Sequence, residues 1–144
     1  MIDYGEKNNP SEEITLEFRN RVKQNIEDAM NEKFSSQILP NIPGVLIKVK
    51  LERAVFEYAL IFRRYVERMV THQYKNYIID LSDTLFLDST FLGSIIVLLK
   101  KIDRIGGTLR VVVNSEKMVL IAQIKSVGDI METFSSVDEA ITNI

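Results

Sequence analysis

The segment from residue 77 to 113 limits the possible folds most, because one helical pattern lies there between two strand patterns. YIIDL, from Tyr77, is short, apolar and rich in branched side chains, as expected for a buried strand. TLRVVV, from Thr108, has the pattern of the next strand. This alternation predicts an α/β fold with helices on one or both faces of a mixed sheet. The apolar residues of the helical pattern are Leu92, Ile95, Ile96, Leu99 and Ile102.

A polar triplet, Asp88-Ser89-Thr90, precedes this helical pattern and marks its N-terminus. All three residue types are favoured helix caps, because their oxygens accept backbone N–H groups that have no partner in the first turn. A functional interpretation is compatible with this one. The Ser89 hydroxyl would lie at the positive end of a helix dipole, where a phosphate is well tolerated. Gly106 and Gly107 follow the helix, where left-handed C-cap residues occur.

The N-terminal half of the chain predicts a helix, a strand-turn-strand unit and a second helix. Residues 11–30 carry apolar side chains at steps of four, with Ser11 as a candidate cap. Turn residues between positions 40 and 44 separate two short apolar stretches. Residues 55–70 return to helical spacing. The two stripes are Ile14, Phe18, Val22, Ile26 and Met30, and Val55, Ala59, Phe62, Val66 and Met69.

The C-terminal part predicts three further elements. We expect a helix over Lys117–Lys125, a short strand over Asp129–Phe134 and a last helix introduced by Ser136. Glu139 follows Ser136 at the spacing of a capping box, in which each of the two side chains accepts a backbone N–H of the other residue.

The composition indicates a folded domain and excludes several kinds of partner. The 144 residues suit one domain, and 46% apolar with 26% charged residues is typical of globular proteins. Eighteen basic against twenty acidic residues give a net charge of −2, which provides no positive field for nucleic acid or an anionic membrane. Cysteine is absent, the N-terminus does not have the pattern of a signal peptide, and no apolar run is long enough to span a membrane. We therefore expect a cytoplasmic protein.

A search for catalytic residues favours a protein that is not an enzyme. His72 is the only histidine and follows a predicted helix, where a solvated imidazole is the simplest interpretation. The glycine pair follows a helix, whereas phosphate-binding glycines follow a strand. Asp80, Asp83 and Asp88 could suggest a metal site or a small hydrolase, but no matching ligand set or calcium loop accompanies them. We predict no metal and no cofactor.

The stretch LSDTLFLDSTFLGSIIVLLKKIDRIGGTLRVVV resembles the core of a STAS domain, the fold of bacterial anti-sigma factor antagonists. The family pattern is a strand, D-S-[ST]-G-[LI]-G, a helix, G-G and a strand. The likeness covers residues 33–144 and includes SEKMVLIAQIKSVGDIMETFSSVDEAI. It implies a STAS fold, with a mixed sheet of four or five strands and helices mainly on one face. Residues 1–32 form an N-terminal extension outside that core, which we predict to be helical.

The resemblance also implies regulation by partner switching. In that scheme the unphosphorylated domain binds an anti-sigma factor that is also a serine kinase, and phosphorylation of the first hydroxyl residue breaks the complex. That residue is Ser89 here, with Asp88, Thr90 and Asp83 as its environment, and a serine phosphatase would restore binding. Alternatives are a constitutive scaffold or a transporter-regulating STAS module, in which Ser89 is only a cap.

The helix after Ser89 is apolar over an unusually wide arc, which suggests a surface for the partner. Phe91, Leu98 and Ile105 recur every seven residues, beside the main stripe. Phe91 stands where the family usually has glycine, while Gly93 keeps the second glycine. Phe91 is either an interface anchor or a satellite core contact. The predicted partner-binding residues are Phe91, Leu92, Ser94 and Leu98.

The apolar stripe of the N-terminal extension must bury itself for the helix to be stable in water. We expect it to pack on its own domain or on a second copy of the chain, which would make a homodimer.

Overall fold

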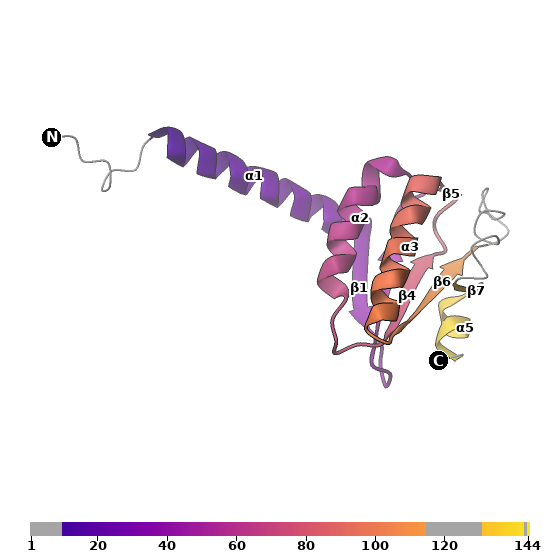
Figure 1. Cartoon of the computed structure of the whole chain (residues 1–144). Coiled ribbons are helices and arrows are strands. Elements are labelled where there is room, and N and C mark those ends of the chain that lie inside the picture. The colour runs from indigo at the N-terminus through magenta and orange to yellow at the C-terminus, as the bar shows by residue number, and fades with distance from the viewer. Residues whose placement is uncertain (1–9, 115–130, 143) are drawn as a thin grey trace.

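A five-stranded sheet forms the centre of the computed structural model, which describes residues 10–114, 131–142 and 144. The strand order is β1-β2-β4-β6-β7 (Figure 1). β1 and β2 pair antiparallel, and the other neighbours pair parallel. The mixed sheet that the alternating pattern predicted is thus confirmed. The strands span Phe34–Ile38 (β1), Gly44–Val49 (β2), Asn76–Leu81 (β4), Thr108–Val113 (β6) and Glu132–Phe134 (β7).

Two long helices cover one face of this sheet. They are α2, Phe56–Met69, and α3, Ser89–Arg104, which lie side by side in Figure 1. The short helix α5, Val137–Thr142, packs on the other face through Ala140. Successive residues of a strand point to opposite faces, so Ile79 joins the large core under α2 and α3 while Ile78 joins the smaller one. The predicted α/β fold, with helices mainly on one face, is confirmed.

Two glycines end α3 for different reasons. Gly106 has φ of +75°, a left-handed conformation that a side chain rarely adopts. Gly107 lies so close to the neighbouring loop that an added Cβ would be 2.6 Å from the carbonyl oxygen of Lys75. The chain can therefore turn directly into β6, as the glycine pair predicted.

The N-terminal helix α1, Pro10–Lys33, extends away from the sheet (Figure 1). Among the described residues, its C-terminal end is the part that packs on the domain, where Met30 is buried and Ile26 is half-buried. The predicted helix is confirmed, but Ser11 is not its cap. The helix already begins at Pro10, whose fixed φ and missing N–H suit the first turn.

The remaining predicted elements are confirmed where the structure describes them. The hairpin between β1 and β2 turns at Asn41, whose φ is +64°. Before α5, the Ser136 hydroxyl accepts the Glu139 N–H at 3.1 Å, whereas the Glu139 carboxylate accepts the N–H and hydroxyl of Ser135. The helix predicted over Lys117–Lys125 lies outside the described residues. Within the described ranges, none of the helices combines the length and apolar character needed to cross a membrane.

Substitution of glycine by alanine should have opposite effects at two positions of this fold. Gly107→Ala should lower the free energy of unfolding by about 1–3 kcal/mol, because its Cβ would meet a backbone oxygen. Gly93 lies within α3, and no atom lies within 4 Å of an added Cβ. Gly93→Ala should therefore raise the free energy of unfolding by about 0.5–1 kcal/mol. Urea denaturation measures both, and equal effects would contradict the described packing.

Candidate functional site

The Asp88 carboxylate joins the starts of two helices. As the N-cap of α3 it accepts the Phe91 N–H at Oδ1, at 2.8 Å, and its Oδ2 accepts the N–H of Phe56, the first residue of α2, at 2.7 Å. N–H groups in a first turn have no helical partner, and a negative charge there is favoured by the helix dipole. The first turns of α2 and α3 are therefore held at one carboxylate.

A two-stranded ladder brings these helix starts together. β3, Arg53–Ala54, pairs parallel with β5, Phe86–Leu87, immediately before α2 and α3. The Asp88 N–H extends the ladder by donating to the Ala54 oxygen at 3.1 Å. The guanidinium of Arg53 also lies over the Phe86 ring, 4.5 Å from its centre. The sequence pattern did not predict this ladder, because strands of two residues are too short to show alternation.

The loops that lead into the ladder are also fastened to each other. The Glu52 carbonyl accepts the N–H groups of Leu85 and Phe86, at 2.8 and 3.1 Å. The buried Thr84 hydroxyl donates to the Leu51 carbonyl at 2.8 Å. The loops after β2 and β4 are thus fixed before either helix begins, which holds Asp88 in place.

Ser89 and Thr90 follow Asp88 as the first two residues of α3, and both are exposed. The helix start predicted at the polar triplet is confirmed. The Asp88 side chain accepts the N–H of Phe91, the third residue of α3. The N–H groups of Ser89 and Thr90 come before that N–H, at the start of the first turn. A group attached to the Ser89 oxygen would therefore lie in solvent at the positive end of a helix dipole.

The four predicted partner-binding residues, Phe91, Leu92, Ser94 and Leu98, are all buried. The Phe91 side chain is fully buried, with its ring centre 4.7 Å from that of Phe62 on α2. This burial does not fit the first interpretation of Phe91, that of an interface anchor. Phe91 points into the space between α3 and α2, so the alternative of a core contact holds.

Two exposed apolar side chains beside Asp88 were missed by the sequence analysis. Phe56, whose N–H binds Asp88, is 65% exposed, and Leu60, one turn further along α2, is 57% exposed. They share a helix face with Arg63 and Glu67, which line a hollow between α2 and α3. Their offset from the apolar stripe of residues 55–70 was the signal that could have revealed them. We call Phe56, Leu60, Ser89 and Thr90 the Ser89 surface.

The three aspartates near the end of β4 do not form one site, because Asp80 and Asp83 both face Lys48 whereas Asp88 accepts the N–H groups of the two helix starts. Asp83 lies 3.1 Å from the Lys48 Nζ, and the buried Asp80 lies 4.0 Å from the same atom. Neither carboxylate hydrogen-bonds to Ser89 or Thr90 among the described residues, and the described partner of Asp83 is Lys48. The predicted place of Asp83 in the environment of Ser89 stays a prediction. In the part of the chain that the structure describes, no three His, Asp or Glu side chains are grouped to hold a metal ion.

The sequence model of the STAS domain matches residues 12–140, which is most of the chain. Among curated protein sequences, none matches. The matched range includes most of α1.

Solved structures show the same fold. A candidate anti-sigma factor antagonist from Thermotoga maritima aligns with a TM-score of 0.64 and 22% identity, over 80% of this chain and 97% of that one. An anti-sigma factor antagonist from Mycobacterium paratuberculosis aligns with a TM-score of 0.64 and 16% identity, over 77% of this chain and 93% of that one. The anti-sigma factor antagonist SpoIIAA in its unphosphorylated form aligns with a TM-score of 0.57 and 12% identity, over 76% of this chain and 94% of that one. These alignments show that the folds are alike, and at such low identities they show the fold alone.

Removal of the Asp88 carboxylate should destabilise both helix starts together. Asp88→Ala leaves the N–H groups of Phe91 and Phe56 without their acceptor. One lost cap costs about 0.5–2 kcal/mol, so we expect a loss of about 1–4 kcal/mol in the free energy of unfolding. Asp88→Asn keeps one acceptor oxygen and should fall between Asp88→Ala and the wild type in urea denaturation. Wild-type stability of Asp88→Ala would contradict the bridging role.

Proposed function

This chain belongs to the STAS domain family, and on that premise we propose that it is an anti-sigma factor antagonist controlled by phosphorylation of Ser89. In this proposal it is a cytoplasmic regulator with no catalytic activity of its own. The observation that carries the proposal is the exposed Ser89 hydroxyl on the first residue of α3, beside the Asp88 cap and the exposed Phe56.

The Ser89 surface suits a protein partner. It combines two exposed apolar side chains with two hydroxyls, and buried aromatic anchors contribute much of the energy of protein interfaces. Gly93, one turn after Ser89, leaves open space on α3 where a partner backbone could approach closely. We assign the surface to an anti-sigma factor that is also a serine kinase, with a serine phosphatase acting on the phosphorylated form.

Phosphorylation would change the interface and leave the fold intact. In the reaction the Ser89 oxygen bonds to the γ-phosphorus of ATP, ADP leaves, and the kinase accepts the hydroxyl proton. The phosphate adds a charge of about −1.5 to −2 next to Asp88, and the N–H groups of the first turn can hold it. Within a packed interface the same charge is costly to desolvate and repels acidic neighbours of the partner. The complex would therefore dissociate while the domain remains folded.

A constitutive scaffold or transporter-regulating module is the second candidate function. Asp88 already caps α3, and Phe91 fills the position where the family pattern has glycine. Both observations fit a helix start that has only a structural role, with a partner bound permanently and no phosphate cycle.

Substitution at Ser89 separates these two functions. Ser89→Asp should leave the unfolding midpoint nearly unchanged and weaken binding of the kinase at least about tenfold, equivalent to about 1.4 kcal/mol. Ser89→Ala should keep binding and accept no phosphate. The partner is isolated by affinity capture from native cells and identified by mass spectrometry, and its affinity for each variant is then measured by calorimetry.

Thr90→Ala is the matched control, because Thr90 is the neighbouring exposed hydroxyl. It should accept phosphate as the wild type does. Incorporation that survives Ser89→Ala and disappears in Thr90→Ala would contradict the assignment. Absence of phosphate from the wild type in the presence of the bound kinase and ATP would favour the scaffold.

Two phenylalanines in the first turns of α2 and α3 should respond in opposite ways to truncation. Phe91→Ala removes a fully buried ring and should lower the free energy of unfolding by about 3–5 kcal/mol. Phe56→Ala removes an exposed ring, so it should change stability by less than about 0.5 kcal/mol. If Phe56 anchors the partner, the same change should weaken binding by at least about 1 kcal/mol. Unaltered binding by Phe56→Ala would exclude it from the interface.

A further inference from the structure

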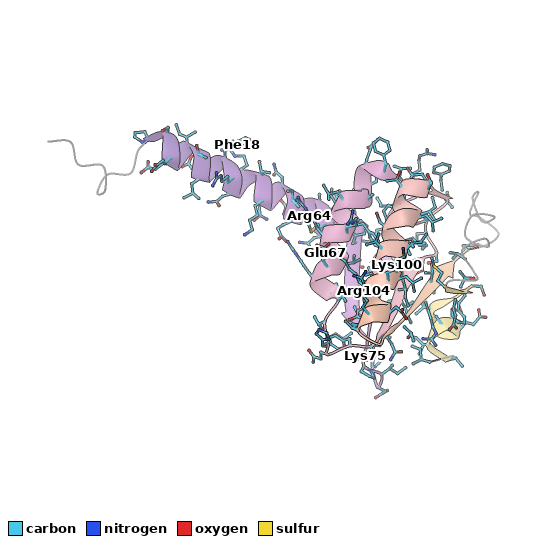
Figure 2. The ribbon with its side chains drawn as sticks, viewed as in Figure 1. Phe18, Arg64, Glu67, Lys75, Lys100 and Arg104 are labelled. Carbon is cyan, nitrogen blue, oxygen red and sulfur yellow. The ribbon has the colours of Figure 1, made fainter. Side chains whose placement is uncertain are left out.

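The N-terminal half of α1 presents an apolar stripe to solvent. Ile14 and Phe18 are 66% and 64% exposed, and Val22 is also exposed. The same stripe continues into Ile26 and the buried Met30, where α1 reaches the domain. Figure 2 shows Phe18 on the part of α1 that extends away from the domain. A helix in water depends mainly on tertiary packing of its apolar face for stability. The first half of α1 receives little of that packing from the part of the domain that the structure describes.

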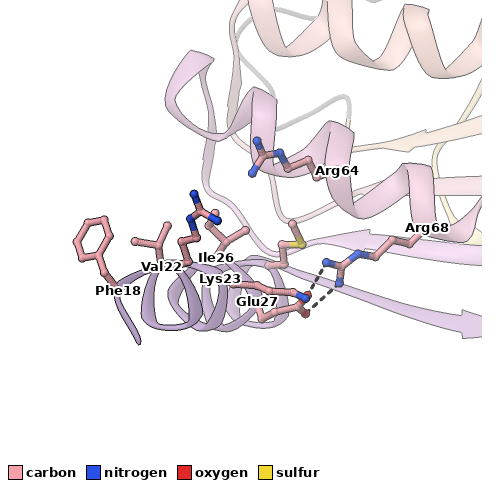
Figure 3. A pocket seen from close by; sticks show the side chains of 9 residues that line it. Phe18, Val22, Lys23, Ile26, Glu27, Arg64 and Arg68 are labelled. Atoms are coloured by element: carbon pink, nitrogen blue, oxygen red, sulfur yellow. Dashed lines mark hydrogen bonds and ion pairs between the residues drawn. The ribbon is translucent and has the colours of Figure 1, made fainter. Parts of the chain in front are cut away.

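A groove between α1 and α2 leads from this stripe to the domain. Its α1 side includes Phe18, Val22 and Ile26, and its α2 side carries Arg64 and Arg68 (Figure 3). Arg68 makes a two-point ion pair with Glu27, and these hydrogen bonds hold the pKa of the Glu27 carboxyl below its ordinary value. Arg64 is exposed and lies within 4 Å of no carboxylate among the described residues. The α1 side of the groove thus combines the apolar stripe with the charged Arg19, Lys23 and Glu27, and the α2 side adds the positive charge of Arg64.

The charges of α1 are complementary to those of a second, antiparallel copy. An acidic block comes first, and a basic block follows within the same exposed half of the helix. An antiparallel partner lays the acidic block of each copy along the basic block of the other, whereas a parallel partner would place like charges together. The acidic block is Glu12, Glu13 and Glu17, and the basic block is Arg19, Arg21 and Lys23.

The apolar stripe has the same symmetry about Phe18. In an antiparallel pair centred there, Phe18 meets its own copy and Ile14 of each chain lies level with Val22 of the other. The acidic start of the second α1 then lies at the level of Lys23, within the groove that Arg64 lines. The two domains lie at opposite ends of the helix pair, so they do not collide.

From this juxtaposition we propose that the chain forms a homodimer through an antiparallel pair of α1 helices, each lying in the groove of the other copy. The interface uses α1 and the C-terminal half of α2, whereas the Ser89 surface uses the first two turns of α2 and the first turn of α3. The dimer therefore does not rest on the proposed function, and either can fail without the other.

Light scattering on the full chain tests the dimer. One helix pair is a small interface, so we expect a dissociation constant on the order of 1–100 µM and measure the molar mass up to about 500 µM. The wild type should approach twice the chain mass of 16.6 kDa. Phe18→Glu should remain at the mass of one chain, with unchanged thermal unfolding of the domain. A wild type with the mass of one chain throughout would overturn the proposal and leave the stripe to a different partner.

Leu16→Glu is the matched control on the same helix. Leu16 is 59% exposed, but two residues turn a helix by about 200°, so it points away from the stripe that contains Phe18. Leu16→Glu should keep the mass of the dimer. Equal loss of the dimer in both variants would indicate general disruption of α1, and retention by Phe18→Glu would exclude the stripe; either result overturns the proposal.

Cysteine cross-linking tests the antiparallel orientation, since the chain has no cysteine of its own. In the antiparallel pair the two copies of residue 14 lie about 12 Å apart along the axis, beyond the reach of a disulfide. Ile14→Cys alone should therefore not cross-link under oxidation, whereas a mixture of Ile14→Cys and Val22→Cys chains should. Efficient cross-linking of Ile14→Cys alone would indicate a parallel pair and overturn the proposal.

Discussion

The position of the Ser89 surface depends on one carboxylate. Asp88 accepts an N–H from the first turn of α3 and another from the first residue of α2, so its side chain fixes both helix starts at once. With this bridge in place, the next residue, Ser89, is exposed at the surface, whereas Phe91, three residues after Asp88, is buried in the core. Phe56, at the start of α2, is exposed. Without it, the ladder of β3 and β5 would still join the two loops, but neither helix would be capped.

The sequence predicted this fold where local chemistry decides the structure. Helical and strand periods give α1, α2, α3 and β4, and the polar triplet and glycine pair give the ends of α3. The role of Phe91 could not be predicted in the same way. A helical stripe tells which residues share a face, but it does not tell how far a neighbouring helix wraps around that face. Because α2 packs on the flank of α3, Phe91 and Leu98 are buried although they lie beside the main stripe.

The aspartates near β4 also show that a sequence pattern does not tell which elements become neighbours in the fold. Asp80, Asp83 and Asp88 are close in sequence, which suggested a shared site. The register of the sheet instead places Lys48 of β2 opposite Asp80 of β4, where its ammonium also reaches Asp83. Two strands that are distant in sequence become neighbours only through the strand order, which periodicity cannot supply. Asp88, beyond β5, is separated from this group by the ladder that positions it.

Helix α2 connects the two surfaces that this structure presents, and its length keeps them electrostatically separate. Its first residue, Phe56, lies at the Ser89 surface, and Arg68, near its other end, holds α1 through Glu27. Twelve residues of helix separate these points by about 18 Å, roughly twice the distance over which physiological salt screens exposed charges. A phosphate on Ser89 would therefore act on a partner bound at the first turns without disturbing the ion pairs along α1. In a dimer joined through α1, the two Ser89 surfaces would then switch independently, and a bivalent partner would lose its avidity as soon as one of them is modified.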